Sequence, residues 1–125
     1  MTIQTLRILI CDDSVLARKK LKDYLATLEV KAIYEAIDGQ DAIDKYKEFI
    51  PDLVFMDIVM PKKTGIEAVT EILKLNPKAK VVMASSVGTQ NHLKDAINAG
   101  AYEFLQKPIE NSHVLKIIQN MIKEA

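Results

Sequence analysis

Three aspartates, one serine and one lysine stand at the ends of short apolar runs in this sequence. Asp12 and Asp13 follow the first run, Asp57 ends the third, Ser85 ends the fourth and Lys107 follows the fifth. An aspartate in such a place, taken singly, usually caps a helix or shapes a turn. Capping explains the joint appearance of acidic, hydroxyl and cationic side chains at four such ends poorly. The pattern therefore predicts a site for chemistry.

This set of side chains favours the attack of a carboxylate on phosphorus. Two carboxylates about 4 Å apart repel by about 4 kcal/mol at an effective dielectric constant of about 20. A cluster of three therefore needs a cation, or one protonated member. An all-oxygen site with few protein ligands suits Mg²⁺, which also takes phosphate oxygens. Lys107 adds a mobile positive charge and Ser85 a hydroxyl donor. Phosphoryl transfer to an aspartate depends mainly on such positioning and charge neutralisation.

The elements that must position these residues are five apolar runs that alternate with segments of helical period. The runs lie at residues 6–11, 32–36, 53–56, 81–84 and 102–105. Several are nearly continuous, which is typical of strands covered on both faces. The alternation predicts an α/β fold with a parallel sheet and helices on both faces, and it leaves the strand order open. Because the carboxyl ends of parallel strands share one edge, the polar residues are expected to meet there.

The composition fits one cytoplasmic domain over residues 1–125. Hydrophobic residues make up 49% of the chain, enough for a core, and 17 basic residues balance 17 acidic ones. This balance gives no electrostatic reason to expect nucleic acid or an anionic membrane as a partner. No apolar run approaches the ~20 residues that span a bilayer, and no signal-peptide layout begins the chain. The single cysteine suits a reducing compartment.

The candidate residues also fall in motifs of a known family. The motifs are Asp12-Asp13-Ser14, Met56-Asp57-Ile58-Val59-Met60-Pro61 followed by Gly65, Val82-Met83-Ala84-Ser85-Ser86, Ala99-Gly100-Ala101 and Phe104-Leu105-Gln106-Lys107-Pro108. In this order and spacing they are highly specific. The chain resembles, over essentially its whole length, the receiver domains of bacterial two-component response regulators, among them the stand-alone CheY-like chemotaxis regulators. The resemblance implies a flavodoxin-like fold, a doubly wound five-stranded parallel sheet in the order 2-1-3-4-5 with five helices.

The resemblance also implies a role for each site residue. Asp57 would be the phosphoacceptor. Asp13 and Asp57 would ligate Mg²⁺ directly, together with the backbone carbonyl of Val59, whereas Asp12 would act largely through water. Lys107 would bind the phosphoryl group, and its peptide bond to the following proline would be cis.

A switch between two states follows from the same resemblance. The Ser85 hydroxyl would move to the phosphoryl group, and Phe104 would turn into the space that it leaves. The surface of the fourth helix, fifth strand and fifth helix would then bind a target protein, such as a flagellar switch. The phosphoryl donor would be a phosphohistidine on a sensor histidine kinase (CheA-like) or a phosphotransfer protein. Arg18 and Lys22, four residues apart, are expected to help dock an acidic kinase surface.

Other functions stay open beside this signalling role in chemotaxis. The chain could pass its phosphate onward as a phosphorelay intermediate. A Mg²⁺-dependent phosphatase of the haloacid dehalogenase type would carry a second aspartate where Val59 stands, together with a cap domain. A nucleotide- or flavin-binding module would carry a glycine-rich phosphate loop, which the sequence lacks. We therefore expect a monomeric phosphoacceptor that catalyses only its own phosphorylation and dephosphorylation, rather than an enzyme.

Three positions depart from the usual family pattern. Phe104 replaces a frequent tyrosine, so an output contact through that hydroxyl is absent. Ser86 stands where alanine is usual, beside the acceptor aspartate. Val59 and Val87 follow Asp57 and Ser85 by two residues. Because valine cannot orient an attacking water by hydrogen bonding, we expect slow self-dephosphorylation.

Overall fold

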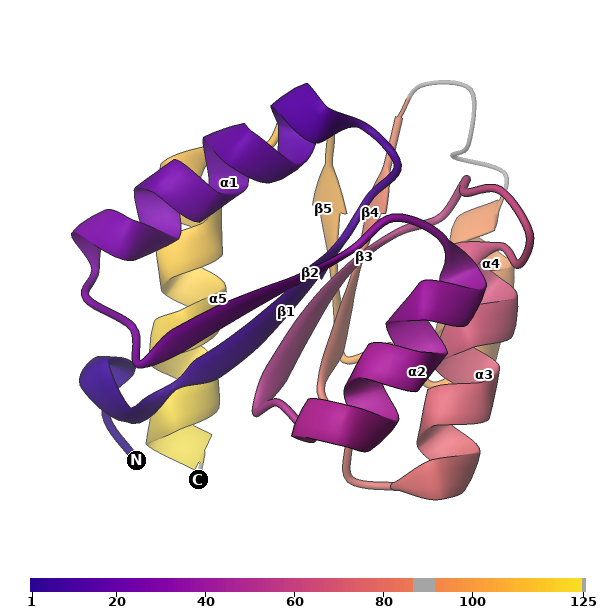
Figure 1. Ribbon diagram of the computed structural model, residues 1–125. Coiled ribbons are helices and arrows are strands. Elements are labelled where there is room, and N and C mark those ends of the chain that lie inside the picture. Colours follow the sequence, from indigo (N-terminus) through magenta and orange to yellow (C-terminus); the bar gives the residue numbers. More distant parts are fainter. Residues whose placement is uncertain (87–91, 125) are drawn as a thin grey trace.

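The computed structural model describes residues 1–86 and 92–124, in which five strands alternate with five helices (Figure 1). The strands are β1 (Arg7–Cys11), β2 (Ala32–Ala36), β3 (Leu53–Asp57), β4 (Val81–Ser85) and β5 (Glu103–Gln106). The helices are α1 (Val15–Thr27), α2 (Gly39–Phe49), α3 (Gly65–Leu75), α4 (Leu93–Ala99) and α5 (Asn111–Glu124), with a 3-10 turn, η1 (Ile3–Thr5), before β1. Each of the five predicted apolar runs thus forms a strand.

The five strands form one parallel sheet in the order β2-β1-β3-β4-β5, which confirms the doubly wound, flavodoxin-like arrangement. β1 and β3 are neighbours, with Cys11 opposite Met56. β3 and β4 pair with Asp57 opposite Ala84. The residues that follow β1 therefore lie beside the end of β3, and the end of β4 adjoins it on the other side. This order places the predicted site at the centre of the sheet edge.

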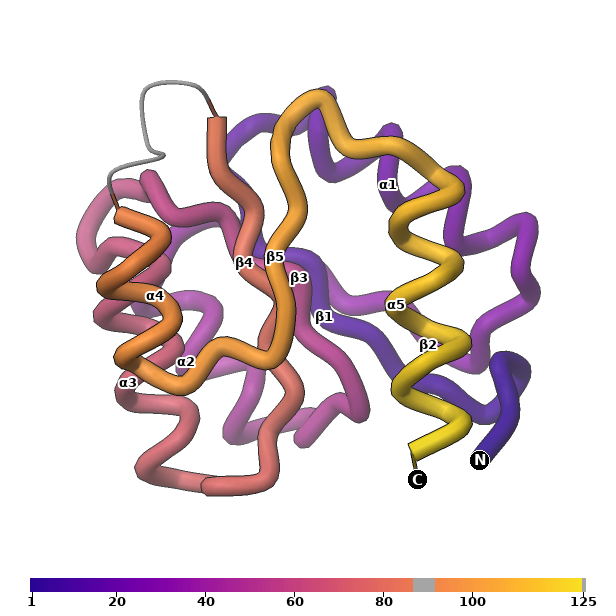
Figure 2. Tube along the Cα trace, turned by 180° about the vertical axis from the view of Figure 1, so that it is seen from behind, coloured from indigo at the N-terminus to yellow at the C-terminus, as the bar shows by residue number. Residues whose placement is uncertain are grey.

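Two hydrophobic layers enclose the sheet. α1 and α5 cover one face, and α2, α3 and α4 cover the other, as the two opposite views show (Figures 1 and 2). Along β1 the side chains alternate between the two layers, with Leu9 and Cys11 in one core and Ile8 and Ile10 in the other. Because both faces are covered, the strands consist of almost continuous apolar residues.

The helices on the carboxyl side of the strands begin with side-chain caps close to the site. The Ser14 side chain accepts a hydrogen bond from the Ala17 N–H at 3.1 Å, and α1 starts there. Thr64 and Glu67 form a capping box at the start of α3, with hydrogen bonds of 3.1 and 3.2 Å. These caps fix the backbone just after the acidic residues. Among the described residues, no helix combines the length and apolar character needed to cross a lipid bilayer.

Candidate functional site

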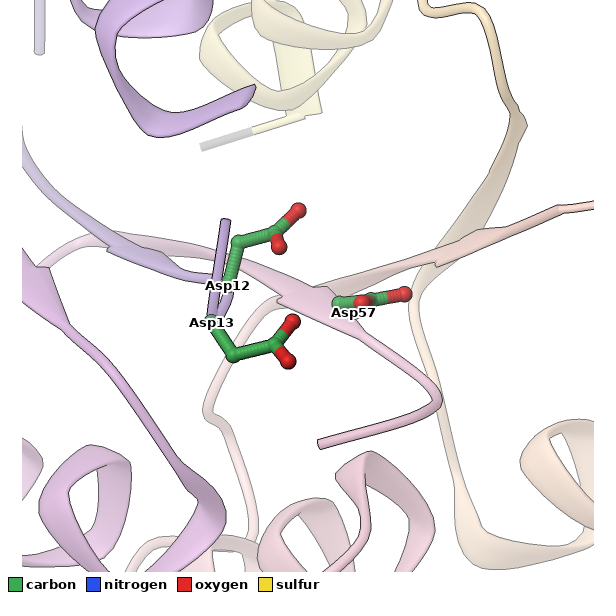
Figure 3. Close-up of side chains that lie close together, drawn as sticks. All are labelled: Asp12, Asp13 and Asp57. Carbon is green, nitrogen blue, oxygen red and sulfur yellow. The ribbon is translucent and has the colours of Figure 1, made fainter. Parts of the chain in front are cut away.

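The carboxylates of Asp12, Asp13 and Asp57 meet at the carboxyl edge of the sheet (Figure 3). One oxygen from each lies within 4.8 Å of the others. Asp57 is the last residue of β3, and Asp12 and Asp13 directly follow β1. Asp12 and Asp57 are buried, with 6% and 9% exposure, whereas Asp13 faces solvent. The structure therefore brings together the three acidic residues that the sequence singled out, with one side of the cluster open to water.

Lys107 reaches this cluster from the end of β5. Its Nζ lies 2.8 Å from Asp12 Oδ2 and 3.4 Å from Asp57 Oδ2. Its backbone N–H donates to the Ser85 carbonyl at 2.7 Å, and the Lys107–Pro108 peptide bond is cis, as expected. The lysine is thus fixed by its backbone to β4, while its ammonium contacts the residue after β1 and the last residue of β3.

Burial and charge act against each other at these groups. Burial raises the pKa of the Asp57 carboxyl above its ordinary value. The Lys107 ammonium opposes this rise, and the Asp12 charge adds to it. Burial alone would lower the pKa of Lys107, but its contacts with Asp12 and Asp57 outweigh that effect and raise it. The lysine therefore stays protonated at neutral pH, and one ammonium faces three carboxylates. A divalent cation would balance the remaining negative charge.

Asp13 is more available to a metal ion than Asp12. Asp12 Oδ1 accepts from the Ser14 N–H at 2.9 Å, and Asp12 Oδ2 is bonded to Lys107. Asp13 has no hydrogen-bond or ion-pair partner among residues 1–86 and 92–124. The donors are all oxygens, few in number and open to water on one side. Such a set fits Mg²⁺, which retains several of its waters.

Ser85 and Phe104 lie on the two strands beyond Asp57. Ser85 is the last residue of β4 and is 2% exposed. Phe104, in β5, pairs with Met83 and is partly buried against the core beneath α2, α3 and α4. Ser86 is exposed just after β4. Val87, the second of the two valines noted in the sequence, lies outside the described residues.

The structure assigns Arg18 a different role from the one predicted. Its guanidinium donates to the Asp12 carbonyl at 2.7 Å and pairs with Glu35 of β2 at 3.2 Å. Only 12% of its side chain is exposed, so Arg18 offers little surface to a partner. Lys22 pairs with the same glutamate at 3.2 Å and stays half-exposed. Arg18 thus holds the backbone of the acidic cluster instead of docking a kinase.

Sequence reasoning missed two features around the cluster. A cleft of about 240 Å³ opens beside Lys107, between the start of α1 and the β5–α5 connection, and Leu16, Pro108 and Ile109 contribute to its lining. Asp38, before α2, is buried at 5% exposure. The sequence contains a usable signal for Asp38, since an Asp-Gly pair before a helix predicts a cap. A cleft between distant segments has no such signal.

The fold is that of a receiver domain, and the chain belongs to the family of response regulator receiver domains, whose model matches residues 8–119. It is 41% identical over 117 residues to the chemotaxis protein CheY of Thermotoga maritima, covering 94% of this chain and 98% of that relative. It is 42% identical over 116 residues to CheY of Bacillus subtilis, covering 93% of this chain and 97% of that relative. The chain is therefore closely related to the CheY chemotaxis regulators.

Solved structures agree with this assignment. The chain is similar to one described as a CheX–CheY–BeF3–Mg²⁺ complex from Borrelia burgdorferi, with a TM-score of 0.86 and 34% identity over 94% of this chain and 89% of that chain. The receiver domain of NtrX from Brucella abortus matches with a TM-score of 0.86 and 28% identity, covering 94% of this chain and 99% of that chain. Both likenesses extend over nearly the whole sheet and its helices.

Proposed function

We propose that this chain is a stand-alone response regulator, a single receiver domain over residues 1–125, that accepts a phosphoryl group on Asp57 in a Mg²⁺-dependent reaction. One observation carries the proposal. Three carboxylates converge within 4.8 Å, and a lysine ammonium lies 3.4 Å from the carboxylate of Asp57. The chemotaxis relatives support a cytoplasmic role in that pathway. In this role the chain catalyses only its own phosphorylation and dephosphorylation.

In the proposed reaction, the Asp57 carboxylate attacks the phosphorus of a phosphohistidine on a CheA-like sensor kinase or a phosphotransfer protein. An oxygen–phosphorus bond forms while the phosphorus–nitrogen bond breaks, and its electron pair stays on the imidazole. Asp13, Asp57 and the Val59 carbonyl would hold Mg²⁺, with Asp12 acting through water, and the ion would neutralise charge on the phosphoryl oxygens. Lys107 would exchange its contact with Asp57 for one of those oxygens.

The response would be a change of the α4–β5–α5 surface. The phosphoryl group brings extra charge and acceptor oxygens to the sheet edge. The Ser85 hydroxyl would donate to one of them, and Phe104, now partly buried, would turn further inward. A target protein, such as a flagellar switch component, would then bind the altered surface. Ser85 supports this proposal by its burial at the end of β4, next to the residue paired with Asp57.

Exposed apolar side chains around the cluster support a protein as the phosphodonor. Val15 and Leu16, at the start of α1, are 70% and 75% exposed, and Val59 is 54% exposed. Exposed apolar side chains beside a polar site are candidates for contact with a protein partner. A phosphatase for small phosphoesters would need no such surface, so this observation favours the signalling role.

Treatment with acetyl phosphate tests the proposal. Wild-type protein is expected to gain one phosphoryl group by intact mass, only when Mg²⁺ is present, and Asp57→Asn protein none. Asp52→Asn is a matched control, because Asp52 lies just before the other end of β3 and accepts from the Arg7 N–H at 2.9 Å. Incorporation in Asp57→Asn that equals the wild type would refute the assignment. Repeated turnover of phosphoesters would identify a phosphatase instead. Transfer of the phosphoryl group to the histidine of a second protein domain would identify a phosphorelay intermediate.

A further inference from the structure

The turn before α2 lies against the loop that follows Asp57. We call residues 37–39, which end at the first residue of α2, the β2–α2 turn, and residues 58–64 the β3–α3 loop. Gly39 donates its N–H to the Pro61 carbonyl at 3.5 Å. A Cβ atom on Gly39 would overlap the Lys63 carbonyl oxygen and lie 2.6 Å from the Lys63 Cβ. Gly39 has no left-handed backbone conformation, so only its missing side chain permits this close approach.

A buried carboxylate adds a second contact between the same segments. Asp38 caps α2 through Oδ1, which accepts from the Asp41 N–H at 2.7 Å. Its other oxygen, Oδ2, lies 3.6 Å from the Nζ of Lys62. Lys62 has a φ of 66°, in the left-handed region that a lysine rarely adopts. The Asp38 carboxylate therefore faces the one loop residue whose backbone is held in a costly conformation.

The start of the β3–α3 loop is also fixed, by the first residue of α3. Gly65 donates its N–H to the Ile58 carbonyl at 2.8 Å, and a Cβ there would overlap the Asp57 carbonyl. Val59, whose carbonyl is the proposed metal ligand, stands between this anchor and the contacts with the β2–α2 turn. The loop is thus held at its start by α3 and at its middle by the turn.

We propose that the β2–α2 turn is a positioning element for the metal site. Gly39, by close approach, and Asp38, through Lys62, hold the β3–α3 loop so that the Val59 carbonyl meets Mg²⁺ together with Asp13 and Asp57. The inference rests on the proposed function, since it assumes that the ion binds there. It assigns a role in metal affinity to residues that do not touch the metal.

Variants that remove one lysine charge distinguish positioning of the β3–α3 loop from a direct effect of charge on Mg²⁺ affinity. Lys62→Gln removes a positive charge near the site, which by charge alone would tighten Mg²⁺ binding. Positioning predicts the opposite, an affinity weakened about threefold, in line with a partly exposed ion pair. Lys63→Gln is the matched control, because Lys63 lies in the same loop but pairs with Glu71 of α3 at 2.7 Å. It should bind Mg²⁺ as tightly as the wild type or more tightly.

Gly39→Ala tests the close approach itself. Alanine is the better helix former, so a purely local effect would stabilise α2. Positioning instead predicts that the β3–α3 loop moves and that Mg²⁺ affinity falls about tenfold.

Two measurements test whether the β2–α2 turn positions the β3–α3 loop. Calorimetric titration with MgCl₂ gives the affinity, and hydrogen exchange of the peptide covering residues 58–64 in metal-free protein gives the loop's stability. Lys62→Gln and Gly39→Ala should both raise that exchange, and Lys63→Gln should not. A wild type that does not bind Mg²⁺ would defeat the proposed function. A wild type that binds, with all three variants equal to it in affinity and exchange, would defeat this inference alone.

Discussion

The two ends of the sheet use charged side chains in opposite ways. At the amino end, the Arg7 guanidinium donates to the carbonyls of Phe49 and Ile50, which end α2. It also lies 5.8 Å from the centre of the Tyr34 ring, and the Asp52 carboxylate accepts from the Arg7 N–H. Each charge there satisfies a backbone group or an aromatic face, so this end contributes to folding.

At the carboxyl end, the charged side chains destabilise the folded chain. Asp12, Asp13 and Asp57 share one small region with a single ammonium, and burial raises the pKa of Asp57. Like charges held this close destabilise the folded chain until a cation joins them. Stabilising and reactive charges thus lie at opposite edges of one sheet, as is usual where function needs an unfavourable local arrangement.

The strongest test of this contrast is Asp57→Asn. Phosphoryl incorporation should be abolished, whereas the free energy of unfolding of the metal-free protein at neutral pH should rise. The reason is that the raised pKa of Asp57 means its ionised form is disfavoured in the folded state. That penalty is present above the folded-state pKa and disappears as pH falls toward the ordinary value of 3.8. Urea unfolding of both proteins at neutral and acid pH measures the effect.

The expected signature is a difference between variant and wild type that shrinks in acid. If Asp57→Asn were less stable than the wild type at neutral pH, the carboxyl end would be stabilising like the amino end, and the contrast would fail.

Metal binding at the carboxyl end should stabilise the folded chain. At a free Mg²⁺ concentration about 100 times Kd, the free energy of unfolding should rise by about 2.7 kcal/mol. Asp13→Asn should lose most of that gain, since Asp13 is exposed and without a partner among the described residues. Asp52→Asn, at the amino end, should keep it. Thermal unfolding with and without MgCl₂ distinguishes these outcomes.

Arg7→Met tests the amino end. The methionine keeps an apolar stem but loses the donors to the end of α2 and the cation over Tyr34. We expect the free energy of unfolding to fall by about 2 kcal/mol, with acetyl phosphate incorporation and Mg²⁺ affinity unchanged. Chemical denaturation and the mass assay measure the two quantities side by side. A slower phosphorylation in Arg7→Met would mean that the two edges are coupled.

The sequence predicted the fold because both layers leave a direct pattern in it. Strands covered on two faces are almost continuously apolar, as in Leu53–Met56, and the helices between them carry their own caps. It also placed the polar residues at one edge, since parallel strands share it. The order of the strands came from the family resemblance, because apolar pattern does not record which strands are neighbours.

The sequence could not predict which residues from distant segments contact each other in the fold. Arg18 and Lys22 look like a docking surface on a basic helix, yet both pair with Glu35 on the adjacent strand. Helical spacing describes contacts within one helix and contains no information about the next element. The approach of Gly39 to Lys63 is hidden for the same reason.

The smallest expected effect concerns an uncharged residue at the carboxyl end. Val59 is 54% exposed, two residues beyond Asp57, and its side chain offers no hydrogen bond to an attacking water. In Val59→Asn the amide could orient that water. A hydrogen bond that lowers the activation free energy by about 1 kcal/mol would speed self-dephosphorylation about fivefold. The rate is measured by loading the protein with acetyl phosphate, removing the donor and following loss of the phosphoryl group.

Val15→Asn is the control for this last experiment. Val15 is also exposed at the same end, but it begins α1, after the acidic pair rather than after the acceptor. It should leave the decay unchanged. Equal decay in Val59→Asn and wild type would mean that the lifetime of the phosphoryl group is set elsewhere. A faster decay in Val59→Asn alone would show that the carboxyl edge divides its tasks, with the charged residues setting whether phosphate is accepted and a neutral neighbour setting how long it stays.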